Sequence, residues 1–271
     1  MEMNTYQKQY KTLHHFHGLQ PFFKKRHCQR LIGQQYTEFV SEFYQMQISE
    51  DHPPVFAVPD GCIDILFECD QHNPQARICG STLHSQYVEL KENIPYFGIR
   101  FLPGVIPKFI GISASDLINQ SINFYDLVEN NENLVERIVY ADSIDEKINI
   151  FFLSVSSQLK RDFSYITESI IHYIIQQNGE GKIKDLEKIT GYSSRHIQRI
   201  FKQDIGMSIK TFACIMRFQA AIHALDHPTT PKLAHLTYEL GYNDQAHFHK
   251  EFKKFSDMAP TDFIKFITKL N

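Results

Sequence analysis

Short apolar runs separated by turn residues fill the first third of the chain. VFAV (55–58) and CIDILFE (62–68) lie on either side of Pro-Asp-Gly at 59–61. Proline presets φ, aspartate bonds to neighbouring backbone groups and glycine accepts a positive φ, so this tripeptide predicts a turn between two strands. A further strand is expected at YFGIRF (96–101). The pattern predicts a mainly β region over about residues 34–101.

After Pro103-Gly104 the apolar residues recur at helical spacing. Short helices are therefore expected over about residues 104–158, with Ser115 as a candidate N-cap. One stripe repeats every three or four residues and consists of Ile144, Ile148, Phe151, Val155 and Leu159. Packing inside its own domain and contact with a second subunit are both open interpretations of this helix face.

The C-terminal part contains the same pattern twice, about fifty residues apart. IKDLEKITGYSSRHIQRIFKQDIGMS is echoed by LAHLTYELGYNDQAHFHKEFKKFSDMAP. Each unit reads as an apolar helix, a glycine-containing turn and a second helix opened by Ser193 or Asn243 as candidate N-cap. This predicts helix-turn-helix units over about 183–204 and 232–255, joined by a long apolar helix at 208–225.

The second helix of the first unit carries cations and an amide opposite its apolar face. This stripe, spaced i, i+3, i+4 and i+7, consists of Arg195, Gln198, Arg199 and Lys202. Arginine and glutamine can make paired hydrogen bonds to guanine and adenine edges in the major groove. Lys202, one turn further on, better suits a phosphate, and Ser194 at the helix start joins the candidate contacts. An ordinary solvated face is the alternative, and the repeated helix-turn-helix counts against it.

The matching face of the second unit has fewer side chains that can read bases. Its candidate DNA contacts are Asn243, Gln245, Ala246, His247, His249, Lys250 and Lys253. The turn is one residue longer here, so Lys250 takes the register of Arg199. We therefore expect the first unit to supply more base discrimination and the second more anchoring to the DNA backbone.

Four motifs characterise the C-terminal part more narrowly. They are GYSSRHIQRIFK, the linking-helix run RFQAA followed by AL, ELGYNDQAHFHKEFKK, and the closing PTDF. Together they resemble the DNA-binding domain of AraC/XylS-type transcription regulators over the last 110 residues or so. The resemblance implies an all-α domain whose two units contact successive major-groove segments. The residues it implies there are Arg195, Gln198 and Arg199, and Gln245, Ala246, His247 and Lys250.

Three positions depart from the pattern of that family. Ala246 has no donor and offers DNA only a methyl contact. Glu187 and Thr237 stand where the family usually has a small alanine, in the first helix of each unit. A buried glutamate is costly unless its aliphatic stem lets the carboxylate reach a polar environment. The packing of the first unit therefore depends on where the Glu187 carboxylate lies.

The N-terminal half shows a narrower likeness. VPDGCIDILFE followed by GIRFLPGVIPKFIGISASDLIN is similar to a sensor-like domain that precedes such DNA-binding domains in one AraC-type subgroup. This resemblance covers about residues 30–158 and implies a cupin-like β-barrel followed by helices, with no ligand specified. Asp64 and Arg100 are charges within apolar strands, so they are candidates for a structural ion pair or for ligand contact.

Charge is divided unevenly along the 271 residues. The whole chain has 28 basic and 31 acidic side chains, a formal charge of −3. Residues 1–159 hold 12 basic and 19 acidic groups, a charge of −7, whereas residues 160–271 hold 16 and 12, a charge of +4. Such asymmetry indicates a polyanion-binding segment attached to an acidic domain. We expect an α+β protein with a sensor or oligomerisation domain at 1–158 and a DNA-binding domain at 160–271.

Candidate chemistry for catalysis is sparse. The five cysteines include no CxxC pair, and the fourteen histidines show no spacing typical of a metal site. A metal-dependent cupin needs a close His-x-His, and His52, His72 and His84 are far apart. No phosphate-binding glycine loop occurs. We expect no metal, no cofactor and no enzymatic activity. With no apolar run long enough for a membrane span or secretory signal, we also expect a cytoplasmic protein.

The sequence favours a sequence-specific transcription regulator, an activator by the general habit of the family it resembles. Double-stranded DNA is the expected partner, together with RNA polymerase, a small-molecule effector and a second copy of the chain. Two alternatives remain open at this point. One is a regulator without a small-molecule ligand, controlled by a protein partner or by oligomerisation. The other is a metal-dependent cupin-type enzyme fused to a DNA-binding domain.

Overall fold

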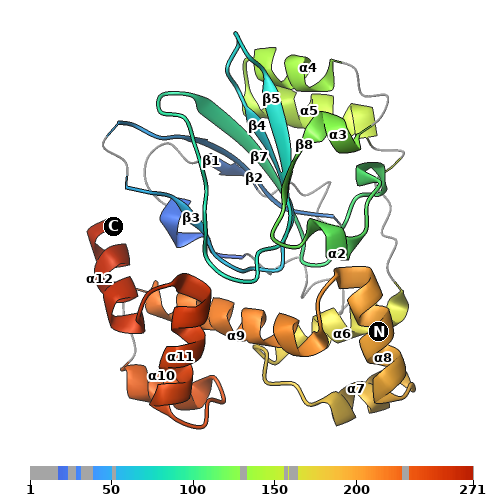
Figure 1. The fold of residues 1–271 in the computed structure, drawn as a ribbon, viewed down its shortest axis with the longest axis vertical. Coiled ribbons are helices and arrows are strands. Elements are labelled where there is room, and N and C mark those ends of the chain that lie inside the picture. Colours follow the sequence, from blue (N-terminus) through green and yellow to red (C-terminus); the bar gives the residue numbers. More distant parts are fainter. Residues whose placement is uncertain are drawn as a thin grey trace, which may run out of the picture.

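A β-sheet with flanking helices is followed by a group of helices in the computed structural model (Figure 1). The structure describes residues 18–23, 29–31, 39–50, 53–128, 133–155, 158, 164–227 and 232–270. We call the described residues up to 155 the N-terminal part and those from 164 onward the C-terminal part. Leu159 of the predicted apolar stripe lies outside the described residues.

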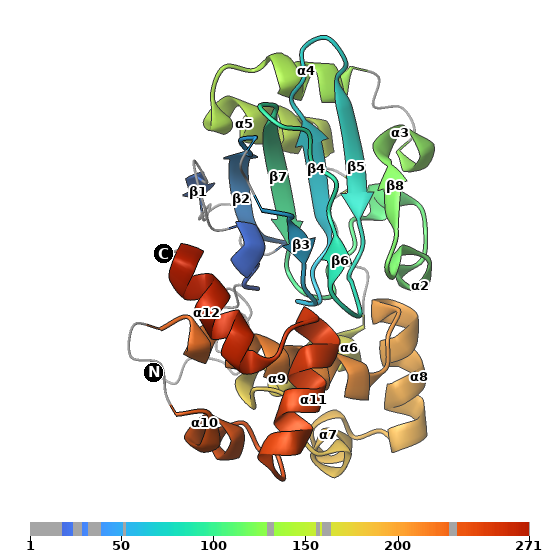
Figure 2. The same cartoon turned by 60° about the vertical axis from the view of Figure 1, so that its left-hand side comes forward.

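The main sheet is antiparallel and six-stranded, in the order β1-β2-β7-β4-β5-β8. Its strands are β1 (Gln29–Leu31), β2 (Val40–Gln47), β4 (Asp64–Glu68), β5 (Gln75–Cys79), β7 (Pro95–Phe101) and β8 (Ser121–Asn123). A second sheet pairs β3 (Phe56–Ala57) with β6 (Gln86–Tyr87), and Figure 2 shows it in front of the main sheet. Strands are present in the region predicted as mainly β, over about residues 34–101. Strand β8 is an exception, because it lies within the region that was predicted to contain helices.

The two faces of the main sheet differ in chemistry because side chains alternate along each strand. One cross-strand row is wholly apolar and buried: Phe43, Ile99, Ile65 and Ile78. It shares a core with α4 (Leu134–Tyr140) and α5 (Ile144–Val155). The row on the opposite face is polar and runs through Glu42, Arg100, Asp64, Cys79 and Ser121.

Short helices follow the strands in the region where the sequence predicted them. They are the 3-10 helix η2 (Lys108–Ile110) and the α-helices α2 (Ala114–Leu117), α3 (Phe124–Leu127), α4 and α5. Ser115 was expected to cap a helix, but the N-cap of α2 is Ser113, whose hydroxyl accepts from the Asp116 N–H. The apolar stripe of α5 is buried against the sheet through Ile144, Ile148, Phe151 and Val155, so it packs inside its own part of the chain.

Seven helices make up the C-terminal part. They are α6 (Tyr165–Gln176), α7 (Ile183–Thr190), α8 (Ser194–Ile205), α9 (Ile209–Leu225), α10 (Leu233–Glu239), α11 (Gln245–Ser256) and α12 (Pro260–Leu270). Short turns join α7 to α8 and α10 to α11, and we call these the first and second helix pairs. A glycine with positive φ lies in each turn, just after the first helix of the pair: Gly191 has φ +75° and Gly241 φ +67°, which glycine adopts without strain.

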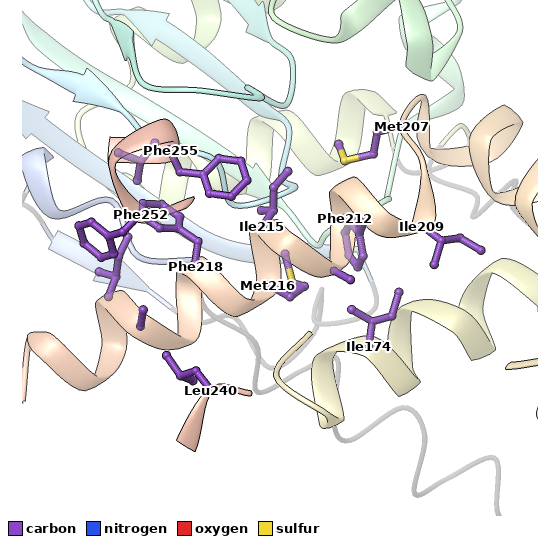
Figure 3. Packing of buried hydrophobic residues seen from close by; sticks show 14 of the residues in the cluster. Ile174, Met207, Ile209, Phe212, Ile215, Met216, Phe218, Leu240, Phe252 and Phe255 are labelled. Carbon is purple, nitrogen blue, oxygen red and sulfur yellow. The ribbon is translucent and has the colours of Figure 1, made fainter. Parts of the chain in front are cut away.

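The long apolar helix α9 is the centre of the C-terminal core. Phe212, Ile215, Met216 and Phe218 project from it among residues of α6 and α11 (Figure 3). The Phe218 ring lies 5.2 Å from that of Phe252 and 5.3 Å from that of Phe255, both on α11. The same core includes Phe22, Val55 and Val58, so the two parts share one apolar cluster. None of the described helices is long and apolar enough to cross a membrane.

Candidate nucleic-acid interface

Helix α8 separates its apolar and polar residues cleanly. Ile197, Phe201 and Ile205 are buried in the core. The predicted outward stripe is exposed along its whole length: Arg195, Gln198, Arg199 and Lys202. Within the described residues no carboxylate pairs with these three cations. The amide of Gln198 donates to the Ser194 hydroxyl at 2.9 Å, so half-buried Ser194 helps to fix a candidate base-reading side chain.

Glu187 has a structural role that the sequence reasoning missed. Its carboxylate Oε1 accepts a hydrogen bond from the Ser194 backbone N–H at 2.6 Å. The first N–H groups of a helix lack internal partners, and a carboxylate near them is favourable. Ser193 is the N-cap, as expected, but its side chain makes no capping bond. Glu187 therefore supplies the cap of α8 from the preceding helix, which explains a glutamate where the family usually has alanine.

Thr237 is the second departure, and it is fully buried. Its hydroxyl donates to the Leu233 carbonyl at 2.7 Å, four residues earlier in α10. Such bonds within a helix satisfy the hydroxyl without an external partner. The position therefore accommodates threonine with no buried polar atom left unpaired.

Helix α11 buries three phenylalanines and exposes a polar face. Phe248, Phe252 and Phe255 point into the core. The predicted contacts Asn243, Gln245, Ala246, His247, Lys250 and Lys253 are exposed, and His249 is half-buried with its ring 5.8 Å from that of Phe248. Asn243 was expected to cap this helix, but Asp244 does so, and its carboxylate accepts from the His247 N–H at 2.7 Å. A charged acceptor also interacts favourably with the positive end of the helix dipole.

A half-buried arginine of α9 contacts the second helix pair. The guanidinium of Arg217 lies 5.0 Å from the centre of the Tyr242 ring and donates to the Gly179 carbonyl at 3.2 Å. The Tyr242 hydroxyl donates to Glu251 at 2.8 Å, and burial raises the pKa of this phenol far above its usual range. Tyr242 belongs to the repeated Gly-Tyr motif, so the sequence marked its position but not its partners.

The predicted pair of Asp64 and Arg100 forms in the N-terminal part. Arg100 donates to both carboxylate oxygens of Asp64, at 2.9 and 2.8 Å. Its guanidinium is also 3.2 Å from Glu42 and 3.5 Å from Asp60, and the residue is 4% exposed. Burial raises the pKa of Asp64 to about 6, and the positive charge of Arg100 opposes that rise. Three carboxylates thus surround one buried cation, which we call the Arg100 cluster.

A cavity of about 200 Å³ lies beside this cluster. Asp64, Cys79, Arg77 and Tyr87 are among its lining residues, and Arg100 is not. A neighbouring cavity of about 240 Å³ continues along the same polar face past Glu68 and Asn123. Of the two residues predicted to touch a ligand, Asp64 reaches a cavity and Arg100 is enclosed by protein groups. Among the residues that the structure describes, no group of three His, Cys, Asp or Glu side chains could hold a metal ion.

Residues 186–265, which include both second helices, match the family model of a helix-turn-helix domain. The C-terminal part carries an AraC-type helix-turn-helix domain. Upstream of this AraC-type domain, residues 33–123 match a domain of unknown function (DUF6597).

Two curated relatives of the chain are transcription regulators. The chain is 24% identical over 191 residues to an uncharacterized HTH-type transcriptional regulator of Haemophilus influenzae, covering 70% of this chain and 62% of the relative. It is 24% identical over 120 residues to the Msm operon regulatory protein of Streptococcus mutans, covering 44% and 42%. The chain thus spans less than two thirds of the length of either relative.

Part of the chain is also similar to a solved structure. A probable AraC family transcriptional regulator from Rhodopseudomonas palustris is 24% identical, with a TM-score of 0.36. The match covers 38% of this chain and 98% of that one.

Proposed function

We propose that the protein is a sequence-specific DNA-binding transcription regulator in which both helix pairs act as helix-turn-helix units. The observation that carries this proposal is the exposure of two outward faces, on α8 and α11, within an AraC-type domain. Each face holds donors suited to base edges or phosphates, and the opposite faces hold the domain core. The two helices would enter successive major-groove segments about one helical turn, roughly 34 Å, apart.

The two units differ in the contacts that they offer DNA. Arg195, Gln198 and Arg199 on α8 can bond to base edges, whereas α11 presents Lys250 and Lys253 beside the small Ala246. We assign base discrimination mainly to the first unit and backbone anchoring mainly to the second.

The N-terminal part would serve as a sensor or oligomerisation domain. We propose domains at 1–158 and 160–271, the first related to the cupin fold through its antiparallel sheet. The cavity beside Asp64 supports binding of a small-molecule effector. Activation through RNA polymerase, self-association and a cytoplasmic location complete the proposal, and catalysis is not part of it.

Selection from random duplexes followed by binding titration tests this function. The full chain should enrich a bipartite site, and the affinity for that site should fall steeply with added salt, because lysine and arginine contacts release counterions from the phosphates. Arg199→Ala should relax the sequence preference. Enrichment of no sequence, or an affinity that does not change with salt, would refute the proposal.

A further inference from the structure

The N-terminal part contacts the AraC-type domain at three separate places, which together we call the interface. The first contact is with the C-terminal end of α8, against which α2 packs. Gly206, which ends α8, lies so close to Ala114 that an added methyl group would be 2.6 Å from its carbonyl. A methyl group on Gly104 would likewise meet the Ile205 side chain at 2.6 Å. The first helix pair therefore rests directly on the N-terminal part.

The second contact is a buried amide in the middle of α9. The Gln219 side chain accepts from the Leu19 N–H at 2.8 Å and donates to the Leu19 carbonyl at 3.3 Å. It also donates to the Pro59 carbonyl at 2.7 Å, and the residue is 1% exposed. One side chain thus satisfies three backbone groups of the N-terminal part, which lie 160 to 200 residues away in sequence.

The third contact joins the N-terminal part to the last helix. The ring of Phe22 lies 4.9 Å from that of Phe266 and 6.5 Å from that of Phe263, both on α12. On its other side Phe22 contacts Phe56 of β3 at 5.6 Å. Helix α12 packs on α11, where the Phe263 ring lies 5.2 Å from that of Phe252. Through α12, Phe22 is therefore linked to the second helix pair.

The segment that Gln219 binds is itself firmly held. The Gln20 side chain bonds to the Val58 backbone at 2.7 and 2.9 Å and to the Asp60 carboxylate at 2.8 Å. Asp60 also accepts from the Cys62 N–H at 2.9 Å and lies 3.5 Å from Arg100. The turn at 59–61 is thus connected to the Arg100 cluster, and Gln219 binds to a fixed point rather than to a free loop.

The interface leaves both outward faces accessible. The predicted contacts on α8 and α11 are exposed except for half-buried Ser194 and His249, while α9, α12 and the end of α8 contact the N-terminal part. The contacts therefore cannot act by covering the DNA-binding faces. They connect both helix pairs to the same N-terminal part instead.

We propose that the N-terminal part sets the relative orientation of α8 and α11, and that Gln219 is the positioning residue at the centre of this interface. The 17-residue α9 is about 26 Å long, and long helices bend, so the linking helix alone leaves some freedom between the pairs. Affinity for two linked sites depends on whether both can be engaged at once. A fixed orientation therefore raises affinity for a two-segment site and leaves affinity for one segment unchanged. This inference rests on the proposed function.

The test compares binding of the full chain to two duplexes. One carries the selected two-segment site, and the other has the segment for the second helix pair scrambled. Gln219→Leu leaves the Leu19 and Pro59 backbone groups unpaired, which favours separation of the two parts. We expect it to weaken binding to the two-segment site about tenfold and to change binding to the single segment less than about twofold.

Two further variants keep the test decisive. Gln176→Leu, at an exposed position near the end of α6, is the matched control and should leave both affinities unchanged. Phe22→Ala weakens the interface from the N-terminal side and should reproduce the selective loss if Gln219→Leu fails to fold, as judged by circular dichroism.

Each outcome has a distinct meaning. A selective loss in Gln219→Leu or Phe22→Ala supports the inference. The inference alone would be overturned if a folded variant lost equal affinity for both duplexes. The same holds if its ratio of affinities for the two duplexes equals that of a wild type that prefers the two-segment site. A wild-type chain that binds neither duplex would refute the proposed function itself.

Discussion

Replacing Arg100 by methionine tests whether the Arg100 cluster stabilises the N-terminal part. The variant keeps a long unbranched side chain but removes the cation that bonds to Asp64 and approaches Glu42 and Asp60. Removing one partner of a buried ion pair typically costs about 3–5 kcal/mol, because the remaining charge is left uncompensated. Here three carboxylates lose one shared cation, so we expect a loss in that range and a fall in Tm of about 10 °C.

The pH dependence of the variant gives a second measure of the same effect. Burial already raises the pKa of Asp64, and without the cation that opposes this rise its folded-state pKa lies further above its unfolded value. Groups with a raised folded-state pKa contribute stability at low pH that is lost as pH rises through that pKa. The destabilisation should therefore be larger near pH 8 than near pH 5.

Urea unfolding at pH 5 and pH 8 measures the unfolding free energy and its dependence on pH. Circular dichroism is the probe, since the chain has no tryptophan to report fluorescence. Arg77→Met is the matched control: Arg77 lies on the same face of the sheet, is half-buried, and donates to the Glu89 carbonyl. We expect that control to lose less than about 1 kcal/mol. If Arg100→Met costs no more than Arg77→Met, or costs more at low pH than at high pH, the reasoning about the cluster is wrong.

Three further predictions concern other residues. Arg199→Ala should lower discrimination between cognate and mutated duplexes more than Lys250→Ala does, and equal losses in the same titration would contradict the division of roles between the units. Glu187→Ala should lower the unfolding free energy by about 1 kcal/mol through loss of the α8 cap, whereas Glu187→Gln should retain most of it; identical urea midpoints for the two would refute this. Because the pKa of Asp64 is raised to about 6, the contribution of this group to stability is lost as pH rises through that value. Asp64→Asn should therefore reduce the fall in unfolding free energy between about pH 4 and 7. The same fall in the variant as in the wild type would contradict this.

The outward faces of α8 and α11 could be predicted because they depend on local periodicity. Outward and inward residues of α8 and α11 follow from helical spacing, and the structure exposes or buries them accordingly. The exceptions are Ser194 and His249, which are both half-buried, His249 beside Phe248. Helix starts were harder, because several polar residues in a row can act as a cap. Asp244 rather than Asn243 caps α11, and Ser113 rather than Ser115 caps α2.

Side chains that bond across the fold could not be assigned from the sequence. Glu187 reads as an unfavourable substitution until the start of α8 is placed beside it, where its carboxylate meets an unpaired N–H group. Asp64 and Arg100 were marked as charges within strands, but the additional approach of Glu42 and Asp60 depends on strand order and on a turn outside the sheet.

The two repeated units, their outward cations and amides, and the change from strands to helices could all be inferred from the sequence, because each depends on residues close together along the chain. The role of Gln219, by contrast, follows from the fold. A glutamine on a helix reads as solvent-facing, yet this one is buried by Leu19 and Pro59, whose backbone groups it satisfies. Local spacing fixes which side of a helix is apolar. Which distant segment covers a polar position depends on the packing of the whole chain.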